Sequence, residues 1–143
     1  MLIAHVIRDK GPAVHTLLVE ATLEQAAKEL YSRKVGALVV VDAQGRVIGV
    51  LSERDIVREV AQRGSSCLAE RIATAMSRDV ITAHPDETVD DGLSRMTDRR
   101  IRHLPVLLDG QLAGIVSIGD LVKHRIAAAE ADAAAMQAYI AAH

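Results

Sequence analysis

The stretch GRVIGVLSERDIVR, residues 45–58, decides the fold because it occurs twice in the chain. Residues 110–123 read GQLAGIVSIGDLVK, and both stretches carry Gly, Gly, Ser, Asp and Val at equivalent positions. Further upstream, Val35-Gly36-Ala37-Leu38 aligns with Ile101-Arg102-His103-Leu104. Self-similarity at a fixed spacing indicates one supersecondary unit that is used twice.

Each copy predicts the same order of elements, β-α-β-β-α. Apolar runs indicate strands, Thr22 with Gln25 indicates a capped helix start, and Asp42 to Gly45 has the composition of a turn. The first copy predicts strands at 14–19, 38–41 and 47–51 and helices from Thr22 and over 53–62. The second predicts strands at Val80, Leu104 and Leu112 and helices over 88–98 and from Ser117. We therefore expect an α+β fold with repeats at 8–63 and 74–126.

The composition excludes several classes of function. The 143 residues include 17 Lys and Arg against 19 Asp and Glu, a net charge of −2, which makes nucleic acid an unlikely partner. No apolar run approaches about 20 residues, so we expect no membrane span. Cys67 is the only cysteine, which rules out an internal disulfide and favours the cytoplasm.

Residues 127–143 form an alanine-rich tail that we expect to be helical, because alanine is the best helix former. One apolar stripe follows the tail: Ile126, Ala129, Ala133, Met136 and Ile140. We expect the tail to pack on the body or on a partner subunit, and a solvated helix is the alternative. Apolar helix faces of this kind also predict a homodimer.

The chemistry-bearing motif is Gly-h-h-Ser-x-x-Asp, where h is apolar. It occurs as Gly49, Ser52 and Asp55 and again as Gly114, Ser117 and Asp120. A helix start after the serine favours an anion such as phosphate, and the aspartate can accept two hydrogen bonds from a ribose diol. Glycine allows a ligand to approach the backbone closely. The same spacing is also that of a plain capping box, so both interpretations stay open.

The quoted stretches resemble a tandem pair of cystathionine-β-synthase-type (CBS) domains, often called a Bateman module, over residues 8–126. The resemblance implies pseudo-two-fold symmetry, with two clefts between the copies. It implies adenosine-containing ligands in those clefts, namely AMP, ADP, ATP or S-adenosylmethionine. It also implies that two modules often dimerise into a disc.

The resemblance assigns a role to each matching residue. Asp55 and Asp120 would read the ribose, and Ser52 and Ser117 would contact ribose or phosphate. The adenine of the Asp120 cleft would lie near the segment Lys10 to His15, with Ala13 among its site residues, and near Val35, Gly36 and Ala37. Phosphate would face Arg102 and His103. We expect the Asp120 cleft to bind phosphate more strongly, because the first copy has Gly36 and Ala37 at the positions of these two residues.

The sequence thus predicts a non-catalytic regulatory module that senses an adenosine ligand and signals to a regulated protein that the sequence does not identify. No nucleophile and base can be placed in one cleft, so no enzyme activity is expected. The histidines show no metal-ligand spacing, and neither a metal nor a cofactor is expected. The alternative is an interaction or scaffold protein whose clefts are empty.

Overall fold

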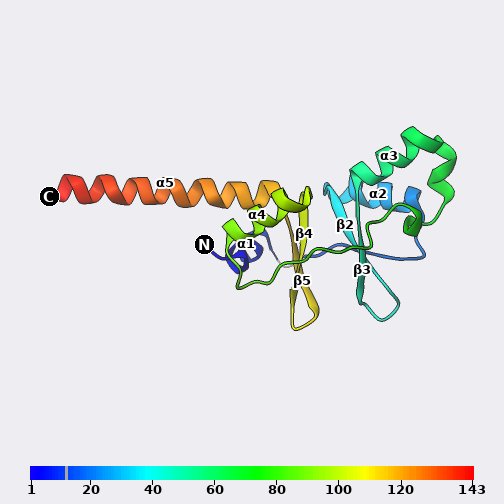
Figure 1. Ribbon diagram of the computed structural model, residues 1–143, viewed down its shortest axis with the longest axis horizontal. Coiled ribbons are helices and arrows are strands. Elements are labelled where there is room, and N and C mark those ends of the chain that lie inside the picture. Colours follow the sequence, from blue (N-terminus) through cyan, green and yellow to red (C-terminus); the bar gives the residue numbers. More distant parts are fainter. Residues whose placement is uncertain (12) are drawn as a thin grey trace. The chain divides into compact units, whose positions relative to one another are not determined.

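The computed structural model describes residues 1–11 and 13–143 and divides them into two compact units. The first-copy unit is Val14–Ile81, and the second-copy unit combines Met1–Ala13 with Thr82–His143. Each unit has its own sheet and its own helices (Figure 1). The α+β architecture predicted from the repeat is confirmed.

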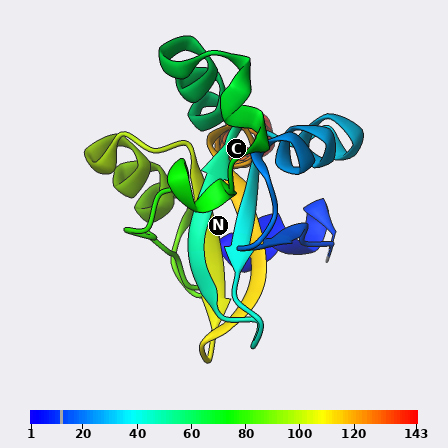
Figure 2. The same cartoon turned by 90° about the vertical axis from the view of Figure 1, so that its right-hand side faces the viewer.

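The first-copy unit contains a three-stranded sheet in the order β1-β2-β3. Its elements are β1 (Thr16–Leu18), α2 (Leu23–Arg33), β2 (Ala37–Val41), β3 (Val47–Ser52), α3 (Glu53–Arg63) and the short 3₁₀ helices η1 (Ser65–Ala69) and η2 (Ile72–Thr74). β1 runs parallel to β2, and β3 runs antiparallel to it. The β2–β3 turn points away from α2 and α3 (Figure 2).

Local sequence explains these elements. The Thr22 side chain accepts a hydrogen bond from the Gln25 amide and thereby caps α2, as predicted. Every residue of β2 is buried, which suits its unbroken apolar sequence. Gly45 adopts a φ of 79° in the turn, a conformation that favours glycine. The core gathers large side chains from all layers, including Leu23, Leu38, Leu51, Ile56 and Ile72.

The second-copy unit has a two-stranded antiparallel sheet, β4-β5. Its elements are α1 (Ile3–Lys10), α4 (Val89–Arg99), β4 (His103–Leu108), β5 (Gln111–Ser117) and α5 (Ile118–Ala142). Asp109 and Gly110, both with positive φ, form the tight turn of the β4–β5 hairpin. The helices and strands predicted from Thr88 onward are therefore present.

The strand predicted at Val80 is wrong. Only a single parallel bridge forms in this region, between Ala83 and Val106. In the first copy the corresponding ladder continues, because the Val19 amide donates to the Val41 carbonyl. Pro85 stands at the equivalent position of the second copy and has no N–H to donate, so the pairing ends there.

Helix α1 was not anticipated, although Ile3, Val6 and Ile7 have helical spacing. The amino-terminal segment docks onto the second copy through its backbone. The Ile3 amide donates to the Glu87 carbonyl over 2.9 Å, and the Val89 amide donates to the Met1 carbonyl over 3.0 Å. Ile3 and Val6 are fully buried in consequence. Residues 1–13 therefore belong structurally to the second copy.

Helix α5 continues through the whole alanine-rich tail (Figure 1). Leu121 is its last buried side chain, and every residue from Val122 to His143 is exposed or only half-buried. The tail therefore does not pack on the rest of its own unit, and that part of the expectation is wrong. Within residues 1–11 and 13–143, no helix is both long enough and apolar enough to cross a bilayer.

The docking of α1 predicts a large stability cost for Ile3→Ala. Truncating this fully buried side chain should lower the free energy of unfolding by about 2–5 kcal/mol, because the lost burial leaves a cavity. Leu18→Ala, at a residue 55% exposed, is the control and should cost less than about 1 kcal/mol. Urea denaturation measures both, and equal effects would contradict the docked position of α1.

Candidate functional site

Both Ser-x-x-Asp motifs form complete capping boxes at a strand-to-helix junction. At the first junction the Ser52 amide donates to Asp55 Oδ2 over 2.8 Å, and the Asp55 amide donates to Ser52 Oγ over 3.3 Å. At the second junction the corresponding distances between Ser117 and Asp120 are 2.9 and 3.1 Å. The capping interpretation of the motif is therefore confirmed in both copies. A cap leaves the serine hydroxyl proton available to a ligand.

The first helical amide at each junction also donates a hydrogen bond within the protein. The Glu53 amide donates to the Gly36 carbonyl over 3.0 Å, and the Ile118 amide donates to the Arg102 carbonyl over 2.8 Å. The residue just before the first strand of each hairpin is thus bonded to the start of the helix that follows the hairpin. These bonds reduce the number of amides that an anion could reach, compared with a bare helix terminus.

Lys10 reaches the second junction from the end of α1. Its ammonium group donates to Asp120 Oδ2 over 2.8 Å and to the Ile115 carbonyl over 3.0 Å. Burial of the Asp120 carboxyl by itself raises its pKa, but hydrogen bonds from Lys10 and Ser117 outweigh burial and hold the pKa below its usual value. The carboxylate is therefore ionised and oriented at neutral pH.

His124 fastens the same end of α1 to the first turns of α5. Its Nδ1 lies 3.0 Å from the Asp120 carbonyl, and its Nε2 lies 3.1 Å from Asp9 Oδ2. Both of these partners are acceptors, so each contact needs a ring N–H of His124 as its donor. The hydrogen bond from His124 also lowers the pKa of the Asp9 carboxyl. No sequence pattern indicates this contact, because 115 residues separate the two side chains.

The first junction has a different counter-ion. Arg58 Nη2 lies 3.1 Å from Asp55 Oδ1, one turn along the same helix. Met76 occupies the position equivalent to Lys10 in the repeat and brings no charge. Asp55 therefore has one bond on each carboxylate oxygen, whereas both bonds described for Asp120 go to Oδ2.

The motif glycines have a packing role. A Cβ atom built on Gly49 would lie 2.7 Å from Met76 Sδ and 3.0 Å from the Ser77 carbonyl oxygen. A Cβ atom on Gly114 would lie 3.0 Å from Ile7 Cδ1. Neighbouring segments of the chain fill the space beside these glycines, where a ligand was expected to approach the backbone. Packing alone therefore accounts for both glycines. Direct ligand contact at these positions stays a prediction.

The remaining predicted site residues fall into two groups. Arg102 is exposed and precedes β4, and His103 pairs with Ser117 across the β4–β5 ladder, so both lie at the second junction. Val35, Gly36 and Ala37 lie at the first junction, where Ala37 pairs with Ser52. Ala13 and His15 lie outside any helix or strand. Pro12, within the predicted segment Lys10 to His15, lies outside the described residues.

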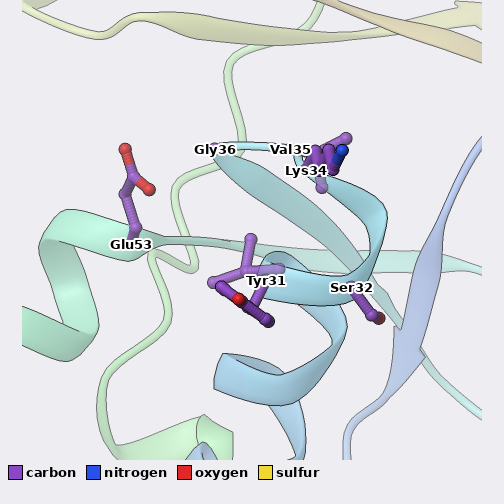
Figure 3. A pocket seen from close by; sticks show the side chains of 7 residues that line it. Tyr31, Ser32, Lys34, Val35, Gly36 and Glu53 are labelled. Carbon is purple, nitrogen blue, oxygen red and sulfur yellow. The ribbon is translucent and has the colours of Figure 1, made fainter.

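A pocket of about 570 Å³ opens beside the first junction. Figure 3 shows the Glu53 side chain on one side of it and Lys34 on the other, with Tyr31 between them in this view. Residues Leu30, Tyr31, Ser32, Lys34, Val35, Gly36 and Glu53 line the pocket. Two of the predicted site residues, Val35 and Gly36, are among them. The Tyr31 ring was not predicted to line a site, and no signal in the sequence singled it out.

The described residues offer no metal site: nowhere among them do three His, Cys, Asp or Glu side chains gather closely enough to hold an ion. The polar atoms at the two junctions are carboxylates, hydroxyls and cations. Such a set suits the hydroxyls and anionic groups of an organic ligand.

Comparison with known sequences assigns this arrangement to a family. The pattern of the CBS domain matches residues 7–62 and again residues 69–127. The chain belongs to the CBS domain family.

An Arabidopsis thaliana protein, the mitochondrial CBS domain-containing protein CBSX3, is 34% identical over 129 residues, which are 85% of this chain and 63% of that protein. An uncharacterised 17.7 kDa protein of Acidianus ambivalens is 39% identical over 111 residues, which are 77% of this chain and 66% of that protein. The CBS chain thus spans about two thirds of the length of these relatives.

Solved structures of CBS proteins share the fold. A CBS-domain containing protein from Agrobacterium tumefaciens superposes with a TM-score of 0.85 at 39% identity, covering 87% of this chain and 99% of that chain. The CBS domain pair of protein MJ0100, in complex with 5′-methylthioadenosine and S-adenosyl-L-methionine, superposes with a TM-score of 0.77 at 29% identity. That match covers 86% of this chain and 94% of the other. The resemblance noted in the sequence is confirmed.

The Lys10–Asp120 pair predicts an acid-dependent stability difference for Lys10→Met, which copies the Met76 side chain of the other repeat. Because the folded-state pKa of Asp120 is depressed, the pair stabilises the fold above the unfolded-state pKa of about 4, and this contribution is lost as the pH falls through the folded-state pKa. We expect the variant to lose about 1 kcal/mol at pH 7 and less at pH 2, where the bond from Lys10 to the neutral Ile115 carbonyl is what the variant still lacks.

Lys28→Met is the matched control, because Lys28 Nζ lies 3.8 Å from Glu24 in an exposed pair. It should leave the free energy of unfolding nearly unchanged at both pH values. Urea midpoints at the two pH values are the measurement. A deficit of Lys10→Met that is equal at pH 7 and pH 2 would contradict the ion pair.

The close packing at Gly49 predicts that Gly49→Ala destabilises the fold by about 1–3 kcal/mol, because a methyl group there overlaps Met76 and the Ser77 carbonyl. Gly119→Ala is the control. Its Cβ would meet nothing closer than 3.7 Å, in a helix, so this variant should be as stable as the native chain or up to about 1 kcal/mol more stable. In thermal melts, the melting temperature should therefore fall for Gly49→Ala and stay unchanged or rise for Gly119→Ala.

Proposed function

We propose that this CBS chain is a non-catalytic regulatory module that binds an adenosine-containing ligand (AMP, ADP, ATP or S-adenosylmethionine) and signals to a partner protein. The observation that carries the proposal is the second junction, where Lys10, Ser117 and Asp120 converge at one helix start. The ligands of the related MJ0100 pair add support, because both contain adenosine.

The geometry favours Asp120 as the ribose reader. A carboxylate offers about four acceptor positions. The described bonds to Asp120 use Oδ2, which leaves Oδ1 as the oxygen for a ribose hydroxyl. Asp55 already has Ser52 on one oxygen and Arg58 on the other. A ligand at Asp55 must therefore compete with Arg58, and we expect weaker binding there.

Cationic side chains favour the second junction for phosphate as well. Lys10, Arg102 and His103 lie at or beside this junction, and the first copy has Met76, Gly36 and Ala37 at the equivalent positions. Charge-assisted hydrogen bonds to phosphate are stronger than neutral ones. A phosphate-bearing ligand is thus expected to prefer the second junction.

The pocket beside the first junction, taken by itself, suits a flat apolar group. Its volume of about 570 Å³ lies in the range of small-molecule sites. Leu30, Val35 and the Tyr31 ring give it an apolar wall, and the Gly36 backbone lies at its edge. We assign to this pocket an apolar ring system such as adenine.

We further propose that the module acts as a homodimer in the cytoplasm. The exposed apolar face of α5 supports a dimer, and the single buried cysteine suits a reducing compartment. A second function, that of an interaction protein with empty clefts, is favoured by one observation. The capping boxes alone would account for both aspartates.

Calorimetric titration of AMP, 2′-deoxy-AMP and S-adenosylmethionine at one salt concentration tests the function. AMP should bind the native chain about 10- to 100-fold more tightly than 2′-deoxy-AMP, the factor that corresponds to one charge-assisted hydrogen bond. Asp120→Ala should abolish the tighter binding event, and Asp55→Ala should spare it.

Asp91→Ala provides a matched control for the loss of a cap. Asp91 forms the same capping box with Thr88 at the start of α4, and neither residue takes part in the Ser52–Asp55 or Ser117–Asp120 box. All three variants should lose about 0.5–2 kcal/mol of stability, but Asp91→Ala should leave every isotherm unchanged. If none of AMP, ADP, ATP and S-adenosylmethionine binds the native chain in such titrations, the proposed ligand-binding function is wrong and the interaction-protein function is favoured.

A further inference from the structure

The exposed face of α5 carries a regular seven-residue pattern. Its large aliphatic side chains beyond Leu121, together with two of its many alanines, are spaced at alternating steps of four and three residues: Val122, Ile126, Ala129, Ala133, Met136 and Ile140. This spacing defines the a and d positions of a coiled coil, with Ile126, Ala133 and Ile140 at a. A strict seven-residue repeat keeps one seam facing one partner helix.

The seam is uncovered in its own chain. Val122, Ile126, Met136 and Ile140 are 40%, 53%, 59% and 65% exposed. The opposite face of the tail consists largely of alanine, so the large aliphatic side chains of α5 beyond Leu121 gather on this one seam. A continuous apolar stripe of this kind marks a surface that is buried against a partner.

Charge complementarity identifies the occupant as a second copy of α5 in parallel orientation. In a parallel pair each g position faces the e position of the next heptad on the other helix. Arg125, whose Nε lies 3.0 Å from Asp90 Oδ1 of its own chain, then faces the partner's Glu130, and Asp132 faces the partner's Gln137. Both contacts occur twice by symmetry, and neither brings like charges together. Isoleucine at the a positions also suits a parallel two-stranded coil.

Antiparallel arrangements fit less well. Full overlap, with Val122 against the partner's Ile140, places Glu130 against the partner's Glu130 and Asp132 against the partner's Asp132. A shorter overlap pairs Lys123 with the partner's Glu130 but leaves Met136 and Ile140 uncovered. The parallel register alone covers the whole seam without facing like charges.

We propose that α5 from Val122 to Ile140 forms a parallel, in-register, two-stranded coiled coil with a second copy of this chain. The proposal rests on the homodimer proposed above and names its surface and orientation. It requires no ligand, so its outcome is independent of nucleotide binding.

The main experiment compares two alanine-to-glutamate variants of the full chain. Ala133→Glu buries a charge in the centre of the seam, and Ala131→Glu adds the same charge on the opposite face. Both substitutions have the same helix propensity cost and the same net charge. Sedimentation equilibrium should show a native dimer whose dissociation constant rises at least tenfold in Ala133→Glu and changes less than twofold in Ala131→Glu.

Two further variants determine the orientation. Glu130→Gln removes an attraction in the parallel register and a repulsion in the full antiparallel register, so it should weaken the dimer in the first case and strengthen it in the second. His143→Cys continues the seam at a d position. Mild oxidation should link two parallel chains, whereas full antiparallel overlap separates the two thiols by about 35 Å. The native chain, in which Cys67 is buried, is the control.

Each outcome decides the proposal. A monomeric native chain at tens of micromolar overturns both the homodimer and the coil, and nucleotide titrations are unaffected by that result. A dimer that survives Ala133→Glu assembles through another surface and overturns the coil alone. Tighter association of Glu130→Gln, or no disulfide in His143→Cys, overturns the parallel orientation. Loss of the disulfide in the double variant Ala133→Glu, His143→Cys shows that the link reports the coil and not random collision, and its persistence overturns the assignment.

Discussion

The hydrogen bond from each junction serine amide to the aspartate three residues later is the constraint on which both units depend. It fixes the point where β3 becomes α3 and where β5 becomes α5. The first helical amide then donates to the carbonyl of Gly36 or Arg102, the residue just before the hairpin. The start of the hairpin and the start of the helix therefore meet at one corner. Because this corner is closed by backbone bonds, the side chains around it are oriented before any ligand arrives.

The internal repeat made most of the secondary structure and both junctions predictable from the sequence. Two aligned copies with turn residues between apolar runs specify strands, hairpins and capped helices by local rules, and these elements, apart from the strand at Val80, occur where the sequence places them. The aspartates could be recognised as cap residues for the same reason, because a cap involves positions only three residues apart. Local signals therefore located both junctions, but they could not separate a cap from a cap that also binds ribose.

What the sequence missed are contacts between distant segments. Lys10 and Asp120 are 110 residues apart, and His124 and Asp9 are 115 residues apart. No periodicity encodes such pairs, and they exist because α1 packs on the second copy. Gly49 and Gly114 illustrate the same limit. Their motif positions suggested access for a ligand, whereas Met76 and Ile7 occupy the space beside them. The lost strand at Val80 differs, since Pro85 was visible in the sequence and could have indicated it.

Helix α5 is where the two copies differ most in what their junctions contact. Its first turn carries Asp120, which Lys10 ties to α1, and its last turns carry the exposed apolar seam. An anion at the second junction meets Lys10 and must redistribute the bonds that this side chain makes to Asp120 and to the Ile115 carbonyl. A ligand shifts a conformational equilibrium only through such differential contacts. The first junction has no equivalent, because Arg58 lies on the same helix as Asp55 and ties it to nothing else. Among the described residues, the second junction is therefore the one at which the proposed ligand would act on the packing of one helix against another.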